Sequence, residues 1–163
     1  MKLADICPID IILDTNVLSH ADNPASPNQV SALQVVSWMR DTSALWVLDD
    51  NGKSAPDPWT SVLYLEYQET LPPQGASITL FLACLQSGRI KFSPRPNHVD
   101  RKAIEKLVPR NKRDRAVLGA AHGSESKILV SNDLSDFSEK VRKSALKELG
   151  VSVLHSEDAA PIL

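Results

Sequence analysis

Short apolar runs alternate along the chain with longer amphipathic stretches. The runs that favour buried β-strands, because they are short, apolar and bounded by polar residues, cover 9–13, 44–48, 89–92, 127–130 and 151–154. Apolar residues at helical spacing predict helices over 29–40, 59–71, 78–86, 99–108, 114–122 and 138–149. This alternation favours an α/β layer fold with a mainly parallel central sheet flanked by helices.

Turn and stop signals separate these elements. Pro72 and Pro73 end the helix over 59–71, because proline cannot continue a helix. Gly123 and Gly150 follow two other predicted helices, and we expect both to act as C-caps. The residues at 49–52, Asp-Asp-Asn-Gly, predict a tight turn. No repeat or long linker divides the chain, so we expect one domain over residues 1–163.

Composition and charge limit the classes of function. The 163 residues are 42% apolar and 23% charged, as in a globular domain with a substantial core. The formal net charge of -2 gives no overall attraction to nucleic acid. A nucleic-acid site would therefore need a local basic patch, or metal ions that offset the phosphates.

Cysteine usage and hydropathy give an expectation about location. Cys7 and Cys84 have neither the number nor the spacing of a disulfide framework or a zinc site. No apolar signal-peptide core precedes Asp10, and no run of 18 apolar residues occurs. We expect a reduced, cytoplasmic protein that does not span a membrane.

Acidic residues stand where strands end. Asp14 closes the first predicted strand, Asp133 follows the strand over 127–130, and Asp114 begins an alanine-rich helix. Sites in open parallel sheets form outside the carboxyl ends of the strands, so we expect these acids in one crevice. Carboxylates that share a site repel one another unless a cation is present. Mg²⁺ or Mn²⁺ suits such oxygen ligands, polarises phosphate and activates water, so the acids predict phosphodiester hydrolysis without a covalent enzyme intermediate.

Three blocks of sequence resemble PIN-domain nucleases and occur in that family's order. They are Ile11–Leu18, Asp114–Ala121, and Ile128–Asp133 followed by Asp136 and Phe137. The resemblance covers most of the chain, although 22–112 matches only loosely. It implies a three-layer PIN-like fold, a single PIN-like nuclease domain, and a divalent-metal-dependent endoribonuclease that hydrolyses single-stranded RNA.

The resemblance also implies roles for individual residues. Asp14 and Asp114 match the first and third family acids, and the site-ordering positions match Thr15, Asn16 and Ser131. Asp133 and Asp136 both fit the closing acid, and we prefer Asp133 as catalytic because it is nearer the strand end, with Asp136 as a further metal ligand.

The second family acid lies on a helix between these blocks. Glu66 and Glu69 are both available, and their three-residue spacing places them close together on a helix surface. We prefer Glu66, because the Glu66-Tyr67 pair resembles one branch of the family. The predicted catalytic and metal-binding acids are thus Asp14, Glu66, Asp114 and Asp133.

A basic cluster surrounds the third acid. It consists of Arg110, Lys112, Arg113 and Arg115. We expect these side chains to contact RNA phosphates, an interaction that weakens as salt rises. The alternative is a solvated helix start.

The acids have structural interpretations too. Asp14 and Asp114 could cap helices, Asp133 could form an Asx turn, and Glu66 could be a solvated helix residue.

Several functions remain open on the sequence alone. The resemblance implies an RNase toxin held inactive by an antitoxin protein, or a housekeeping RNA-processing nuclease, and a homodimer in either case. A haloacid-dehalogenase-type phosphatase would need an Asp two residues after Asp14, where this chain has Asn16. A non-catalytic PIN-like module that binds RNA or protein is the remaining alternative, because fold does not fix function.

Overall fold

A single parallel sheet forms the centre of the molecule. The computed structural model describes residues 8–50 and 52–160, so Cys7 and Asn51 lie outside the described residues. Within that part, the strands are β1 (Asp10–Leu13), β2 (Leu45–Asp49), β3 (Ile90–Ser93), β4 (Ile128–Val130) and β5 (Ser152–Leu154). They pair in the order β3-β2-β1-β4-β5, and every pair is parallel. The α/β prediction is confirmed.

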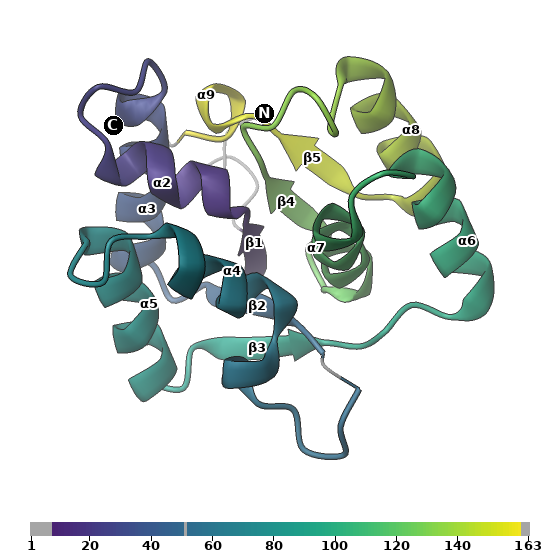
Figure 1. The fold of residues 1–163 in the computed structure, drawn as a ribbon, viewed down its shortest axis with the longest axis horizontal. Coiled ribbons are helices and arrows are strands. Elements are labelled where there is room, and N and C mark those ends of the chain that lie inside the picture. The colour runs from purple at the N-terminus through teal and green to yellow at the C-terminus, as the bar shows by residue number, and fades with distance from the viewer. Residues whose placement is uncertain (1–7, 51, 161–163) are drawn as a thin grey trace.

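Helices cover both faces of this sheet. They are α2 (Thr15–Asp22), α3 (Gln29–Asp41), α4 (Val62–Thr70), α5 (Ala76–Gln86), α6 (His98–Leu107), α7 (Lys112–Gly123), α8 (Glu139–Leu149) and the short α9 (Ser156–Ala159). Figure 1 shows α2, α3 and α5 on one side of the sheet and α6, α7 and α8 on the other. The result is a three-layer α/β architecture, consistent with a PIN-like fold.

The order of the strands creates a switch point in the sheet. The chain moves outward from β1 to β2 and β3, then returns to the other side of β1 to form β4 and β5. Right-handed crossovers in opposite directions put the connecting helices on opposite faces. The connections after β1 and β4 therefore separate, and they leave a crevice at the carboxyl ends of these strands, where open α/β sheets bind ligands.

The core follows the apolar runs of the sequence. Ile11, Ile12 and Leu13 of β1 are fully buried, as expected for a strand covered on both faces. Trp46 of β2 packs edge-on against Phe81 of α5, with ring centroids 5.2 Å apart. These contacts hold the inner strands and the helices around them in fixed positions.

Several element boundaries differ from the sequence prediction. No element is predicted from the sequence over α2, although Val17, Leu18 and Ala21 form its buried face and Asp14 is its N-cap. The predicted helix over 59–71 is divided into the 3₁₀ turn η1 (Pro58–Thr60) and α4, with Ser61 as the N-cap of α4.

The two predicted glycine caps had different outcomes. Gly150 adopts a left-handed conformation with φ 69° and ends α8, so that prediction is confirmed. The prediction that Gly123 is a C-cap is wrong, because Gly123 is the last residue of α7 and Ser124 is the C-cap. A Cβ on Gly123 would lie 2.7 Å from the carbonyl oxygen of Pro94, so glycine is needed there for close packing. No helix among the described residues is long and apolar enough to cross a membrane.

Candidate metal centre

Asp14 lies at the switch point of the sheet. It directly follows β1, and its backbone N–H donates to the carbonyl oxygen of Val130 at the end of β4, at 3.0 Å. Its carboxylate accepts hydrogen bonds from the N–H of Thr15 at 2.8 Å, from Asn16 Nδ2 at 2.8 Å and from Ser131 Oγ at 2.7 Å. Asp14 is therefore both the N-cap of α2 and a buried, oriented carboxylate.

Asn16 and Ser131 connect the loops that follow β1 and β4. Besides donating to Asp14, Asn16 accepts a hydrogen bond from the N–H of Asn132, at 2.7 Å. Ser131 is fully buried, and its Oγ also accepts a hydrogen bond from the N–H of Asp133, at 3.2 Å. These bonds fix the position of one loop relative to the other. All three predicted site-ordering residues, Thr15, Asn16 and Ser131, donate a hydrogen bond to Asp14.

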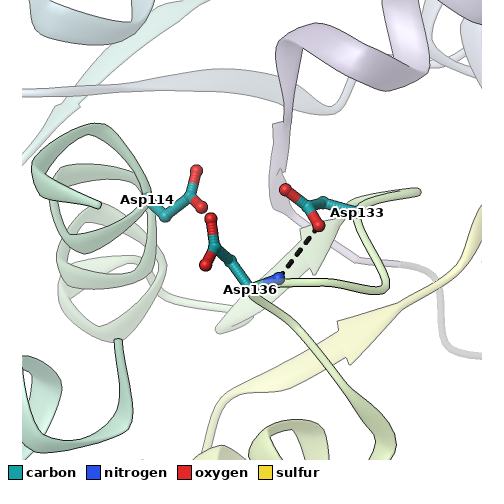
Figure 2. Close-up of side chains that lie close together, drawn as sticks. All are labelled: Asp114, Asp133 and Asp136. Carbon is teal, nitrogen blue, oxygen red and sulfur yellow. Dashed lines mark hydrogen bonds between the residues drawn. The ribbon is translucent and has the colours of Figure 1, made fainter. Parts of the chain in front are cut away.

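Three further carboxylates converge beside Asp14. Carboxylate oxygens of Asp114, Asp133 and Asp136 all lie within 4.8 Å of one another. Figure 2 shows Asp114 on α7 and Asp136 on the loop after β4 with their carboxylates turned toward each other. Asp133 precedes Asp136 on the same loop, and its carboxylate points toward the other two. Both closing acids that the sequence left as alternatives belong to this cluster.

Asn111 holds two members of the cluster. It is the N-cap of α7, and its side-chain oxygen accepts hydrogen bonds from the N–H groups of Arg113 and Asp114. Its amide nitrogen donates to Asp114 at 2.9 Å and to Asp136 at 3.2 Å. Asn111 was not predicted from the sequence, although an asparagine three residues before an acid at a helix start is a recognisable capping signal.

Arg142 shapes the loop that carries Asp133 and Asp136. From α8, its guanidinium donates to the carbonyl oxygens of Phe137 at 2.6 Å, Ser131 at 2.9 Å, Asp133 at 3.1 Å and Val153 at 3.2 Å. Asp133 itself accepts from the N–H groups of Ser135 and Asp136, so its Asx-turn interpretation is correct. The sequence analysis missed Arg142, because α8 carries several basic residues with nothing to distinguish this one.

The helix α4 brings a glutamate to Asp14. Its N-terminus is bound by the buried carboxylate of Asp49, which accepts from Ser61 Oγ at 2.6 Å and from the N–H groups of Val62 and Leu63, each at 2.9 Å. One turn into the helix from Leu63, the Tyr67 hydroxyl donates to the carbonyl oxygen of Leu13, the residue before Asp14. These contacts fix α4 across the end of β1.

Glu66, rather than Glu69, is directed toward the site. The Glu66 side chain is 21% exposed and that of Glu69 is 63% exposed. Burial and the nearby charge of Asp14 raise the pKa of Glu66. Glu69 forms an ion pair with Arg113 at 3.2 Å, and Arg113 also lies 4.0 Å from Glu66.

The carboxylates are packed closely enough to hinder their own ionisation. Burial, a hydrogen bond that protonated Asp114 donates to Asp136, and the charges of Asp14, Asp136 and Asp133 raise the pKa of Asp114 to about 8. Burial also raises the pKa of Asp14, although three hydrogen bonds oppose this. A cation at this point would relieve the repulsion.

The donor set fits a hard divalent cation. It consists of carboxylate oxygens, the ligands that Mg²⁺ and Mn²⁺ prefer. The buried Thr15 hydroxyl faces the Glu66 carboxylate, and this contact opposes the rise in the pKa of Glu66.

The predicted basic cluster is divided by the fold. Arg113 is paired with the glutamates of α4, and Arg110 is exposed on the connection between α6 and α7. Lys112 and Arg115 instead line a cleft on an adjacent face of α7. The four predicted phosphate-binding residues therefore differ in their contacts, and two of them line the cleft.

Comparison with known proteins adds no identification. No model of a known protein family matches this chain, and no curated protein matches it.

Proposed function

We propose that this protein is a divalent-metal-dependent endoribonuclease of the PIN-domain type, which hydrolyses single-stranded RNA. The observation that carries the proposal is the convergence of Asp114, Asp133 and Asp136 next to Asp14, at the switch point of a parallel sheet. This is the place where the sequence blocks that resemble PIN-domain nucleases meet in space. The residues in these blocks are also the ones whose carboxylates face one another.

Each residue of the site has a proposed role. Asp114, Asp133 and Asp136 would hold a Mg²⁺ or Mn²⁺ ion, and Asp14 and Glu66 would complete the acidic site beside them. When bound, such an ion polarises a phosphate oxygen and makes water a stronger nucleophile near neutral pH. Asn111, Ser131 and Asn16 would keep the carboxylates in position, as their hydrogen bonds already do.

The biological setting is part of the proposal and rests on the sequence resemblance. A cytoplasmic protein with this activity would act on cellular RNA. The toxin class implies a homodimer and an antitoxin protein that covers the acidic crevice. A non-catalytic PIN-like module would have the same fold but no need for a functional ion.

The decisive experiment is cleavage of labelled single-stranded RNA by the full chain. Wild type would be compared with Asp14→Asn, in Mg²⁺, Mn²⁺ or EDTA. Asp41→Asn is the matched control, because Asp41 is an exposed acid at the end of α3 that pairs with its neighbour Arg40. We expect metal-dependent cleavage that Asp14→Asn abolishes and Asp41→Asn preserves.

Two other outcomes would contradict the proposal. Cleavage that survives both EDTA and Asp14→Asn would point to a contaminating nuclease. An inactive wild type whose melting temperature does not respond to Mg²⁺ or Mn²⁺ would favour the non-catalytic module.

A further inference from the structure

A cleft opens along α7, on a different face of the helix from Asp114. It has a volume of about 760 Å³, and it lies between α4, α6, α7 and the segment that follows β3. Its apolar walls include Val62, Pro94, Pro96, Ile104, Ala116 and Gly119. Protein sites for small ligands have volumes of about 300–1,000 Å³ and similar apolar walls, so this cleft is large enough for one planar ring and its substituents.

Cationic side chains from three segments line the same cleft. They are Arg95 after β3, Arg101 on α6, and Lys112 and Arg115 on α7. On α7, the residues that line the cleft are spaced three or four apart, so they occupy one face of the helix. Lys112 and Arg115 are predicted from the sequence to contact RNA, whereas Arg95 and Arg101 have no predicted role.

Acidic residues in the cleft only partly offset these cations. Asp49 also lines it, but its carboxylate is occupied by the hydrogen bonds that cap α4. Glu105 lies 4.0 Å from Arg115, at the limit of an ion pair, and the Asp50 carboxylate accepts from the N–H of Gly52. Local positive charge with apolar walls suits a ligand that has both a phosphate and a flat, uncharged ring.

Two cations have limited competition from protein groups. Arg95 donates to the carbonyl oxygen of Asp50 at 3.3 Å, a neutral acceptor. Its guanidinium packs on Gly52, where a Cβ would come within 2.5 Å of Arg95 Cζ. Arg101 is exposed at the cleft. Both guanidinium groups can therefore bind an incoming phosphate.

One helix, α4, leads from the cleft toward the carboxylate site. Val62 lines the cleft, and Glu66 follows it four residues later on the same face of α4, a separation of about 6 Å at 1.5 Å per residue. On α7, by contrast, Asp114 lies on a different face of the helix from the residues that line the cleft. A polymer bound along α4 would reach both sites.

We propose that this cleft binds one nucleotide of the single-stranded RNA, next to the phosphodiester that lies at the carboxylates. Arg95, Arg101, Lys112 and Arg115 would contact its phosphate, and the base would pack on the apolar walls. A single strand is required, because a base stacked and paired in a duplex cannot enter such a cleft. Its position next to the cleaved bond rests on the proposed nuclease function, whereas binding of the nucleotide does not.

The test is binding of a short labelled single-stranded RNA to the full chain in EDTA, measured by fluorescence anisotropy. Arg101→Ala is compared with Lys102→Ala, because these neighbours on α6 are both exposed and Lys102 does not line the cleft. We expect Arg101→Ala to weaken binding about three- to tenfold. It should also reduce the slope of the logarithm of the binding constant against the logarithm of the salt concentration by about 0.7, the contribution of one phosphate contact to a single strand. Lys102→Ala should change neither quantity appreciably.

A second variant tests the apolar part of the cleft. Ala116→Leu fills the cleft without removing a charge, so it should weaken binding while leaving the salt slope unchanged. Its melting temperature should stay close to that of wild type, because Ala116 is only partly buried and the new side chain extends into open space. Equal affinities for single-stranded and duplex RNA of the same sequence would overturn the proposal. So would equal effects of Arg101→Ala and Lys102→Ala.

This experiment separates the two proposals. If no RNA is cleaved in any metal but Arg101→Ala still weakens binding selectively, the nuclease function fails and the nucleotide site stands. If cleavage requires metal and Asp14 but Arg101→Ala and Lys102→Ala have the same KM, the nucleotide site fails and the nuclease function stands.

Discussion

Ser131 Oγ donates a 2.7 Å hydrogen bond to the carboxylate of Asp14, across the junction between β1 and β4. Both side chains are buried, so water does not replace this bond when it is lost. It holds the acid of one strand end in a fixed position relative to the loop of the other. The site is thus built from contacts between residues 117 positions apart in the sequence.

Removing that hydroxyl should damage both stability and activity. Ser131→Ala leaves a buried carboxylate with one donor fewer, which should lower the free energy of unfolding by about 1–3 kcal/mol. The same change should raise the pKa of Asp14 further, because this bond is one of those that lower it. Thermal melting and RNA cleavage would measure the two effects. Ser135→Ala is the control, since Ser135 is exposed on the same loop, and a similar loss in both variants would contradict the argument.

The raised pKa of Asp114 should make the metal-free protein less stable as pH rises. Folded Asp114 titrates at about 8, whereas an unfolded aspartate titrates at about 3.9. Between these values the folded state holds the extra proton, so the free energy of unfolding falls with increasing pH. The stabilising effect is complete below about pH 4 and is lost as pH rises through about 8.

Asp114→Asn should remove this dependence. At about pH 8 in EDTA, the variant should be more stable than wild type by at least about 1.4 kcal/mol, which corresponds to one pKa unit. The difference should shrink toward about pH 4, where wild-type Asp114 is also uncharged. Thermal melts across this range would measure it. A constant difference between the two proteins at every pH would show that the charge of Asp114 is not responsible.

Divalent ions should reverse that trend. An ion that binds the folded state alone stabilises it, by about 2.7 kcal/mol at one hundred times its Kd. Because the ligands must be ionised, the rise in melting temperature on adding Mn²⁺ or Mg²⁺ should increase with pH. Asp136→Asn should reduce this rise in melting temperature. Asp41→Asn should not, because Asp41 is an exposed acid that does not belong to the carboxylate cluster. An undiminished rise in Asp136→Asn would exclude the carboxylate cluster as the binding site.

The two glutamates of α4 should differ in their effect on cleavage. Glu66→Gln removes a half-buried charge next to Asp14, and we expect at least a tenfold loss of kcat, about 1.4 kcal/mol. Glu69→Gln removes an exposed charge that pairs with Arg113, and such pairs contribute about 0–1 kcal/mol. Steady-state cleavage of one RNA by both variants would compare them. The larger loss in Glu69→Gln would reverse the assignment.

The sequence predicted the parts of the site that depend on local patterns. Asp14 and Asp133 were found because each follows a short apolar strand, and the parallel sheet brings such ends together. The α2 helix has a local pattern too, with Asp14 as its N-cap and Val17, Leu18 and Ala21 on one buried face, but it has only 8 residues and was not predicted.

Other parts of the site depend on tertiary contacts alone. Choosing between Asp133 and Asp136 required the geometry of the loop, which places both in the cluster. Arg101 and Arg95 are separated from α7 in sequence, so only the fold reveals that they share a cleft with Arg115. No local pattern marks such residues as neighbours.

Arg142 should support the metal site without being a ligand. Its planar guanidinium donates to carbonyl oxygens of Ser131, Asp133, Phe137 and Val153, and it is partly buried, which lowers its pKa. A lysine keeps the charge but cannot reproduce this fork of donors. Arg142→Lys should therefore lower the free energy of unfolding by about 1–3 kcal/mol through unsatisfied carbonyl groups.

The same substitution should loosen the loop that carries Asp133 and Asp136, and so weaken Mn²⁺ binding about 10–100-fold, as loss of an outer contact does in other metal sites. Titration calorimetry at a temperature where the variant is folded would measure this. Lys143→Ala is the control, because Lys143 is exposed on the same helix and pairs with Glu139, away from the loop. If Arg142→Lys lost stability but bound Mn²⁺ as tightly as wild type, the loop's geometry would not depend on the guanidinium, and Arg142 would have only a structural role.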